Sequence, residues 1–298
     1  MPTMLKFTAT FLVALLALSG CVSTNSDGLS GVSISSSAIR QPYSMTISSE
    51  QARVGDTSQR FEVRHGDCYD YDCDNDRRRV EYQQSNEATS NLIGKVVWYG
   101  WSIYLPSDFP DLAPTNTTLG QVQMHEWRSP MWALNARGGA LLLNAVNTPQ
   151  WMDDCRAASL SSMRGRWTDI MVRADYSLEY SGSNILEVWI NGRRTCTWQR
   201  PVITQEMLNT SRTDALRFKY GIYNSYISRW FQRNATRRVD AEAFVDVHND
   251  SGLVIQSATS RPYDYDWGVE LPTQVVYYDE MRVGPTREDV DIRLIHAE

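Results

Sequence analysis

Apolar and polar residues alternate along much of the chain, and helical periodicity is rare. Alternate side chains of a strand point to opposite faces, so each alternating run predicts a strand with one buried face. The run at 217–223 is the clearest, because its apolar and polar side chains separate completely. The expected inward set is Phe218, Tyr220 and Ile222, and the outward set is Arg217, Lys219 and Tyr223. An apolar core needs no such polar row, whereas a cleft that handles an anionic polymer does.

Further runs predict strands throughout the chain, and one of them, 95–106, is apolar on both faces and so predicts a central strand. They cover 60–64, 77–83, 95–106, 120–127, 139–146, 167–174, 185–190, 193–198 and 274–283. Asn191-Gly192 between two of them predicts a type I′ hairpin. Short helices are expected only at 204–209 and 236–247. This pattern predicts an all-β fold, a β-jelly roll sandwich (concanavalin-like) of two antiparallel sheets with a concave substrate cleft.

The first residues predict export. Residues 1–20 combine Lys6 with an apolar run, as a secretory signal peptide does. The site Leu18-Ser19-Gly20-Cys21 resembles a bacterial lipobox, so cleavage before Cys21 and lipidation of its thiol are expected; an ordinary signal peptide with a chance cysteine is the alternative. Residues 21–49, which begin with the lipidated Cys21 and are rich in Ser, are interpreted as a tether, and 50–298 as a single folded domain. We therefore expect a monomer secreted across the inner membrane of a bacterium and held by lipid, at the outer membrane or facing the periplasm.

Charge and composition narrow the choice of partner. The formal net charge is -6 over 298 residues, and loss of the leader with Lys6 makes it one unit more negative, which argues against nucleic acid. An anionic substrate remains compatible, because Arg and Lys side chains set the local field of a cleft. Aromatic residues make up 11% of the chain, enough for a core and for a surface that stacks on sugar rings.

Four cysteines remain after Cys21, an even number in an oxidising compartment, so two disulfides are expected. Three pairings are possible. We favour Cys68 with Cys73, which would close one loop, and Cys155 with Cys196, which would tie two distant segments.

Polar rows also occur on three other predicted strands. The rows are Arg60, Glu62 and Arg64; then Arg77, Arg79, Glu81 and Gln83; and finally Gln121, Gln123 and His125. If the first two strands share a sheet, their carboxylates would hold the guanidinium groups in a charged lattice. The alternative is an ordinary surface with salt bridges.

Taken together, these rows resemble the active-site strands of jelly-roll polysaccharide lyases, the group of alginate lyases, glucuronan lyases and heparin lyase I-like enzymes. Gln123-Met124-His125 is similar to their Gln-x-His strand. The stretch from Phe218 to Tyr223 is similar to their Tyr-Phe-Lys-x-Gly-x-Tyr strand, with Arg217 in place of the leading Tyr. Their Arg/Glu strand has two candidates here, Arg60-Phe61-Glu62-Val63-Arg64 and Arg79-Val80-Glu81.

Of these enzymes, the chain resembles the heparin lyase-like branch more than the true alginate lyases. Further similarities to that branch are Trp98-Tyr99-Gly100 before Leu105-Pro106, Trp189-Ile190-Asn191-Gly192 and the closing Tyr278-Asp279. The resemblance runs from about residue 58 to about residue 285, with 225–272 longer than usual. It implies an enzyme that cleaves a uronate-containing anionic polysaccharide by β-elimination.

Elimination assigns roles to the polar rows. A lyase removes the proton at C5 of a uronate, stabilises the charge that spreads onto the carboxylate, and protonates the departing O4. Arg79 and Gln123 are expected to neutralise the carboxylate, His125 to act as base and Tyr223 as acid. The residues expected to bind substrate are Lys219, Glu81, Arg217, Arg60 and Arg64. When H5 and O4 lie on one side of the ring, Tyr223 alone would serve as base and acid, and the sequence does not decide between the two routes.

A calcium site is a weaker expectation. Asp70, Asp72, Asp74 and Glu81 take the first, third, fifth and twelfth places of an EF-hand-like loop, but Asn75 replaces the usual Gly. We favour a solvated acidic loop closed by a disulfide, and no cofactor.

Two other functions fit a sandwich. A glycoside hydrolase would need two acidic residues that face the glycosidic bond, and the Glu-x-Asp-x-x-Glu run typical of laminarinases does not occur. A carbohydrate-binding surface lipoprotein without catalysis is the other alternative.

Overall fold

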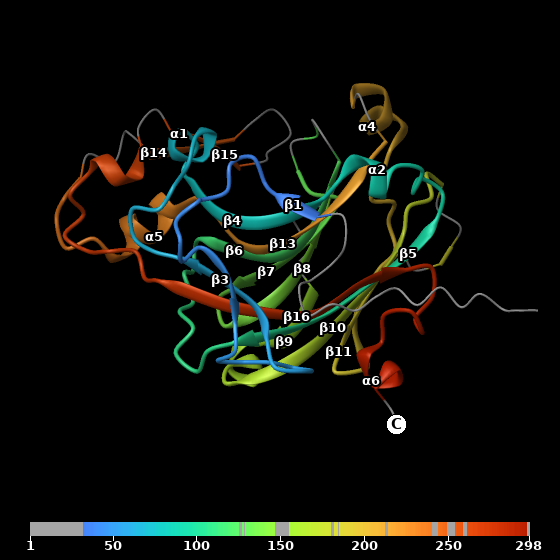
Figure 1. Cartoon of the computed structure of the whole chain (residues 1–298). Helices are drawn as coiled ribbons and strands as arrows, with labels where there is room; N and C mark the ends of the chain where they lie inside the picture. Colours follow the sequence, from blue (N-terminus) through green and yellow to red (C-terminus); the bar gives the residue numbers. More distant parts are fainter. Residues whose placement is uncertain are drawn as a thin grey trace, which may run out of the picture.

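The structure is a computed structural model that describes residues 32–124, 127, 129–146, 155–179, 182–183, 185–211, 214–239, 244–248, 254–258 and 261–296. Two antiparallel sheets of seven strands each pack face to face as a sandwich, which confirms the predicted fold class (Figure 1). Within these residues, no helix is long and apolar enough to cross a bilayer.

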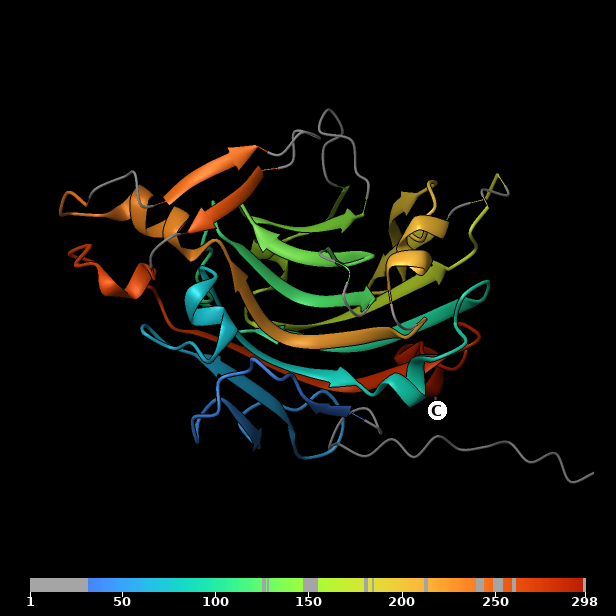
Figure 2. The same cartoon turned by 90° about the horizontal axis from the view of Figure 1, so that it is seen from above.

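The first sheet carries the strand at 217–223 near its middle. In order across the sheet, its strands are β1 (Val32–Ile34), β4 (Arg77–Gln84), β13 (Leu216–Ser225), β6 (Asn116–Met124), β7 (Trp132–Arg137), β8 (Ala140–Ala145) and β9 (Cys155–Ser159). The three polar strands β4, β13 and β6 are therefore direct neighbours, and β13 curves along its length (Figure 2).

The second sheet forms the other layer. Its strands, in order, are β12 (Arg193–Trp198), β11 (Leu186–Ile190), β10 (Arg166–Asp175), β5 (Val96–Leu105), β16 (Gln274–Gly284), β3 (Ser58–Val63) and β2 (Met45–Ser48). A separate hairpin pairs β14 (Phe244–His248) with β15 (Val254–Ala258). The remaining elements are short: α1 (Tyr71–Asp74), α2 (Asn86–Thr89), α3 (Leu160–Met163), α4 (Gln205–Thr210), α5 (Ile227–Asn234), the 3₁₀ turn η2 (Pro262–Asp264) and α6 (Ile292–Ile295).

The core between the sheets contains the inward set of β13. Phe218, Tyr220 and Ile222 are fully buried, as their alternation predicts. Aromatic edge contacts join the layers, and the ring of Tyr278 on β16 lies 5.5 Å from that of Tyr220. The Tyr278 hydroxyl is 2.7 Å from the carbonyl oxygens of both Leu119 and Gly221, so the second sheet holds the backbone of β13 and β6 at the point where their pairing is irregular.

Both predicted disulfides are confirmed. Cys68–Cys73 closes a loop that ends within α1, and Cys155–Cys196 joins β9 to β12. Because β9 and β12 are terminal strands of different sheets, the second bridge fastens the two layers along one edge.

One conditional interpretation and two expectations differ from the structure. The strands at 60–64 and 77–83 do not share a sheet, because β3 pairs with β16 and β2 while β4 pairs with β13 and β1. The helix expected at 236–247 is wrong, since 244–248 forms strand β14. The tether expected at 21–49 contains β1 and β2 from residue 32 onward; these short strands add to sheet edges through backbone pairing and leave Ile34 and Ile47 exposed, so they lack an alternating signal.

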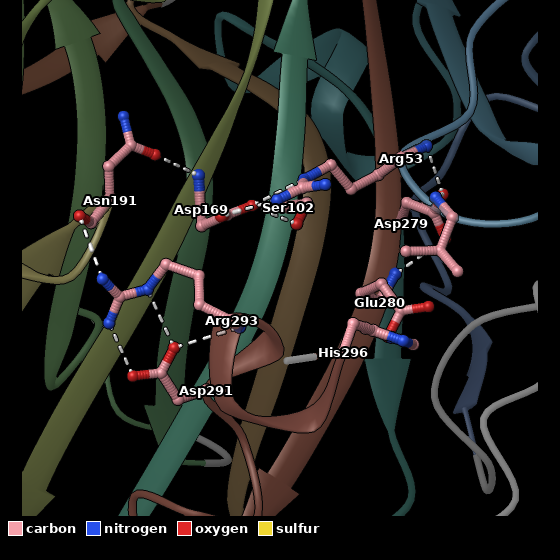
Figure 3. A network of polar contacts seen from close by, with 10 residues as sticks. Arg53, Ser102, Asp169, Asn191, Asp279, Glu280, Asp291, Arg293 and His296 are labelled. Carbon is pink, nitrogen blue, oxygen red and sulfur yellow. Dashed lines mark hydrogen bonds and ion pairs between the residues drawn. The ribbon is translucent and has the colours of Figure 1, made fainter. Parts of the chain in front are cut away.

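A polar network lies on the outer face of the second sheet (Figure 3). Asp169 accepts hydrogen bonds from Arg53 and from Ser102, the latter at 2.7 Å, and Asp279 accepts from the Arg53 backbone N–H at 2.8 Å. Nearby, Arg293 pairs with Asp291 at 2.7 Å and donates to the carbonyl oxygen of Asn191. These contacts attach the segments before β3 and after β16 to the sheet.

Candidate active site

The candidate site is the face of β4, β13 and β6 that points away from the core. Antiparallel register places Tyr223 opposite Arg79 and Gly221 opposite Glu81, while Arg217 lies opposite Gln123. Polar side chains from three neighbouring strands thus meet on one surface, as their alternation predicts.

Arg79 is held by two carboxylates. Its Nε and Nη2 donate to the two oxygens of Asp72, the latter at 2.6 Å, and its Nη1 lies 3.7 Å from Glu81 Oε2. Asp72 is fully buried on α1, at the end of the disulfide-closed loop. Such a bidentate pair fixes the plane of the guanidinium, which lies 4.4 Å from the centre of the Tyr223 ring.

Glu81 is fixed from the other side of β13. Gln121 on β6 donates through Nε2 to Glu81 Oε1 at 2.7 Å, and both side chains are buried. Gly221 on the intervening strand β13 lies opposite Glu81 in the register. Gly221 has a φ of 132°, a region that favours glycine, and a Cβ there would lie 2.2 Å from the carbonyl oxygen of Val80.

Lys219 and Gln123 form the next layer. Lys219 Nζ donates to Gln123 Oε1 at 2.8 Å, and the Gln123 amide donates to the carbonyl oxygen of Trp127 at 3.3 Å. Burial lowers the pKa of Lys219 to about 8, with Arg79 and Arg217 adding to the shift and Glu81 opposing it. This amine therefore changes charge near neutral pH.

Tyr223 is protonated in the resting site. Burial raises its pKa to about 12, although Arg77 and Arg79 act in the opposite direction. Its hydroxyl makes no hydrogen bond to another residue in the described part of the chain. The side chain is therefore suited to donate a proton.

The structure separates the remaining predicted site residues. Arg60 and Arg64 lie on the outer face of the second sheet, because Phe61 and Val63 between them fill the core, and both arginines pair with Glu62. They are not brought to the surface that holds Arg79. Arg217 lies at the edge of the site, half-buried, and desolvation lowers its pKa. His125 and Cys21 fall outside the described residues.

The calcium candidate does not assemble. Asp72 binds Arg79, Asp74 pairs with Arg261 at 2.6 Å, and Glu81 binds Gln121. Among the described residues, no three acidic, His or Cys side chains gather in a way that would hold a metal ion.

Two residues of the site escaped the sequence patterns. Alternation puts Gln121 on the polar face of its strand but indicates no role for it, and the sequence around Asp72 matches only a calcium-loop pattern. A pairing of Gln121 with Glu81 would have required the knowledge that β13 lies between their strands. No sequence signal gives that strand order.

A two-sheet sandwich with an Arg, Gln, Lys and Tyr surface on one face is the arrangement of a jelly-roll polysaccharide lyase. A family model described as polysaccharide lyase matches residues 22–282, and the chain belongs to this family. It is accordingly a lyase that acts on polysaccharides. No curated protein matches the chain.

Solved structures are similar to the chain at low sequence identity. The endo-β-1,4-glucuronan lyase of the fungus Trichoderma reesei is 15% identical with a TM-score of 0.50, covering 85% of this chain and 92% of its own. Alginate lyase AlgAT5 of polysaccharide lyase family 7 is 12% identical with a TM-score of 0.42, covering 76% and 77%. Alginate lyase A1-II′ is 9% identical with a TM-score of 0.45, covering 83% and 85%.

Proposed function

We propose that the protein cleaves a uronate-containing polysaccharide by β-elimination, leaving an unsaturated uronic residue at the new end. The observation that carries this proposal is a protonated Tyr223 set among cations, on a face where the acidic side chains Asp72 and Glu81 are already bound. Elimination needs a proton donor and positive charge, both of which this surface offers.

The roles follow from which groups are available. Lys219 and Gln123, which are bonded to each other on the outer face of the sheet, supply donors for the uronate carboxylate, whose charge grows as the C5 proton leaves. Arg79 adds positive charge beside the Tyr223 ring. Tyr223 then gives its proton to O4 as the C4–O4 bond breaks, and the C4–C5 double bond forms.

The base depends on the substrate's stereochemistry. Where H5 and O4 lie on opposite sides of the ring, as in guluronate or iduronate, His125 takes the C5 proton. Where they lie on the same side, as in glucuronate or mannuronate, Tyr223 must lose its own proton first. A pKa of about 12 opposes that loss and so favours the route with a separate base.

A panel of polymers tests the proposal. The purified protein is incubated with glucuronan, alginate, heparin and related uronates, and the absorbance of the unsaturated product is followed. Each polymer has a control in which the carboxyl groups are reduced to alcohols, because elimination needs the acidity that the carboxylate gives to C5. Product from at least one uronate and from none of the reduced polymers is expected; binding without product from every uronate would favour a carbohydrate-binding protein instead.

Hydrolysis is the less supported alternative. A glycoside hydrolase needs two acidic groups that face the glycosidic bond. On this face Asp72 is fully buried against Arg79, and Glu81 is buried against Gln121. Neither carboxylate is in a position to exchange protons with a sugar.

A further inference from the structure

Arg77 opens β4 two residues before Arg79 and lies on the same face. Register places it opposite Ser225, so it is a diagonal neighbour of Tyr223. Within the described part of the chain, Arg77 makes no ion pair or hydrogen bond, and its Nε is buried without a partner. A buried guanidinium N–H without an acceptor is costly, and such a donor is open to an acceptor that binds beside it.

Arg79, unlike Arg77, has partners for its guanidinium group. Its three nitrogen atoms all face Asp72 or Glu81, and those carboxylates are buried. Displacing Asp72 to admit a substrate carboxylate would leave a charge buried without its partner, which is strongly unfavourable. Of the two arginines, Arg77 is the one available to a ligand.

Tyr71 stands beside Arg77. Its side chain is 54% exposed, and the Arg77 guanidinium lies 5.6 Å from the centre of its ring. The position of Tyr71 on α1 is fixed from both sides, by the Cys68–Cys73 bridge and by the pairing of Asp72 with Arg79. An exposed, rigidly held aromatic ring next to a cation is suited to stack on a sugar whose carboxylate reaches the cation.

We propose that Arg77 and Tyr71 form a subsite for one uronate residue of the polymer, next to Tyr223. Arg77 binds the carboxylate, and Tyr71 stacks on the pyranose ring. The subsite rests on the proposed function for its ligand class. Arg77 is also the charge that most lowers the pKa of Tyr223, so a carboxylate bound there weakens this effect and keeps the phenol protonated.

Binding without turnover tests the subsite. The full-length chain with Tyr223→Phe is titrated calorimetrically with the polyuronate that the wild type cleaves best, or with glucuronan if none is cleaved. In this background, Arg77→Ala should weaken binding roughly tenfold to a hundredfold, as expected for a lost charge-assisted pair. Tyr71→Ala should weaken it by about fivefold, whereas Tyr71→Phe should bind like the parent. Arg194→Ala, an exposed arginine on β12 of the second sheet, is the control and should not change affinity.

Two further binding measurements distinguish a loss of the subsite from a general effect of the substitutions on the fold. Affinity for the carboxyl-reduced polymer should be the same with and without Arg77, but should fall with Tyr71→Ala. Added ethylguanidinium should restore part of the affinity that Arg77→Ala loses, which would not happen if Arg77 only supported the fold. An affinity of Arg77→Ala within threefold of the parent, or an equal loss for both polymers, would overturn the subsite. If affinity depends on Arg77 but the wild type forms no unsaturated product, the proposed function fails while the subsite stands.

Discussion

Gln121 and Glu81 are joined by a hydrogen bond of 2.7 Å, although a whole strand lies between the strands that carry them. On the intervening strand β13, Gly221 lies opposite Glu81 and Lys219 lies opposite Gln121. Glycine at position 221 lets β13 lie close to the backbone of β4, because a Cβ there would be 2.2 Å from the Val80 carbonyl oxygen. Gln121 in turn holds the carboxylate that, with Asp72, orients Arg79.

Gly221→Ala should destabilise the protein and abolish most activity. A Cβ would lie 2.2 Å from the Val80 carbonyl oxygen, and alanine is strained at a φ of 132°, so we expect a loss of about 3 kcal/mol. Gly94→Ala is the matched control, since Gly94 also has a positive φ but open space around it. Chemical denaturation of both variants measures the difference, and equal losses would mean that backbone strain alone matters.

Gln121→Glu should make stability depend on pH. Two adjacent buried carboxylates cannot both ionise, so the pKa of one is raised in the folded state. A group whose pKa is higher in the folded than in the unfolded state stabilises the protein at pH values below its unfolded-state pKa. That stabilisation is lost as the pH rises through its folded-state pKa. The melting temperature of Gln121→Glu should thus fall further below wild type at pH 8 than at pH 4.5, whereas Gln121→Ala should show a similar deficit at both.

Lys219 should set an alkaline limit on activity. Its pKa is lowered to about 8, so the free enzyme loses this positive charge as pH rises past that value. We expect kcat/KM for a uronate polymer to fall above about pH 8, and Lys219→Arg to move that fall to higher pH because arginine stays charged. An unchanged alkaline limit in Lys219→Arg would assign the titration to another group.

The two disulfides should affect different properties. Replacing both Cys155 and Cys196 by Ala opens a long loop and unfastens the sheet edges, which should cost roughly 4 kcal/mol. Activity should persist at low temperature, since β9 lies four strands from β13, or roughly 19 Å. Replacing Cys68 and Cys73 should cost less stability, roughly 2 kcal/mol, but should lower activity strongly because Asp72 and Tyr71 lose their support. Thermal melts and initial rates on both variants distinguish the two effects.

Cys21 should decide where the protein resides. If its thiol is lipidated, radiolabelled palmitate should be incorporated by a bacterial host and the protein should sediment with membranes. Cys21→Ser should block both, while the catalytic rate of the released protein stays unchanged. Soluble wild-type protein without label would favour an ordinary signal peptide.

The sequence predicted what depends on local alternation. Phe218, Tyr220 and Ile222 face the core, Lys219 and Tyr223 face the site, and Asn191-Gly192 turns a hairpin with both residues at positive φ. Alternation says nothing about which sheet a strand joins, however. Two segments with similar Arg/Glu patterns lie in different sheets, namely Arg60-Phe61-Glu62-Val63-Arg64 and Arg79-Val80-Glu81. Pairings between distant positions, such as Asp72 with Arg79, were equally inaccessible, because their geometry exists only after the chain has folded.

Val290 has a practical consequence for anyone who shortens this chain. The match to the family model ends at residue 282, so a shortened chain could be designed to end there. Val290, which follows this position, packs against Met171, Trp189 and Trp98 on the outer face of the second sheet. Gly100 leaves room for this segment, since a Cβ there would lie 2.3 Å from the Val290 carbonyl oxygen. A chain cut after Gly284 would uncover two tryptophans side by side, and such a surface promotes self-association. Expression boundaries should therefore include α6.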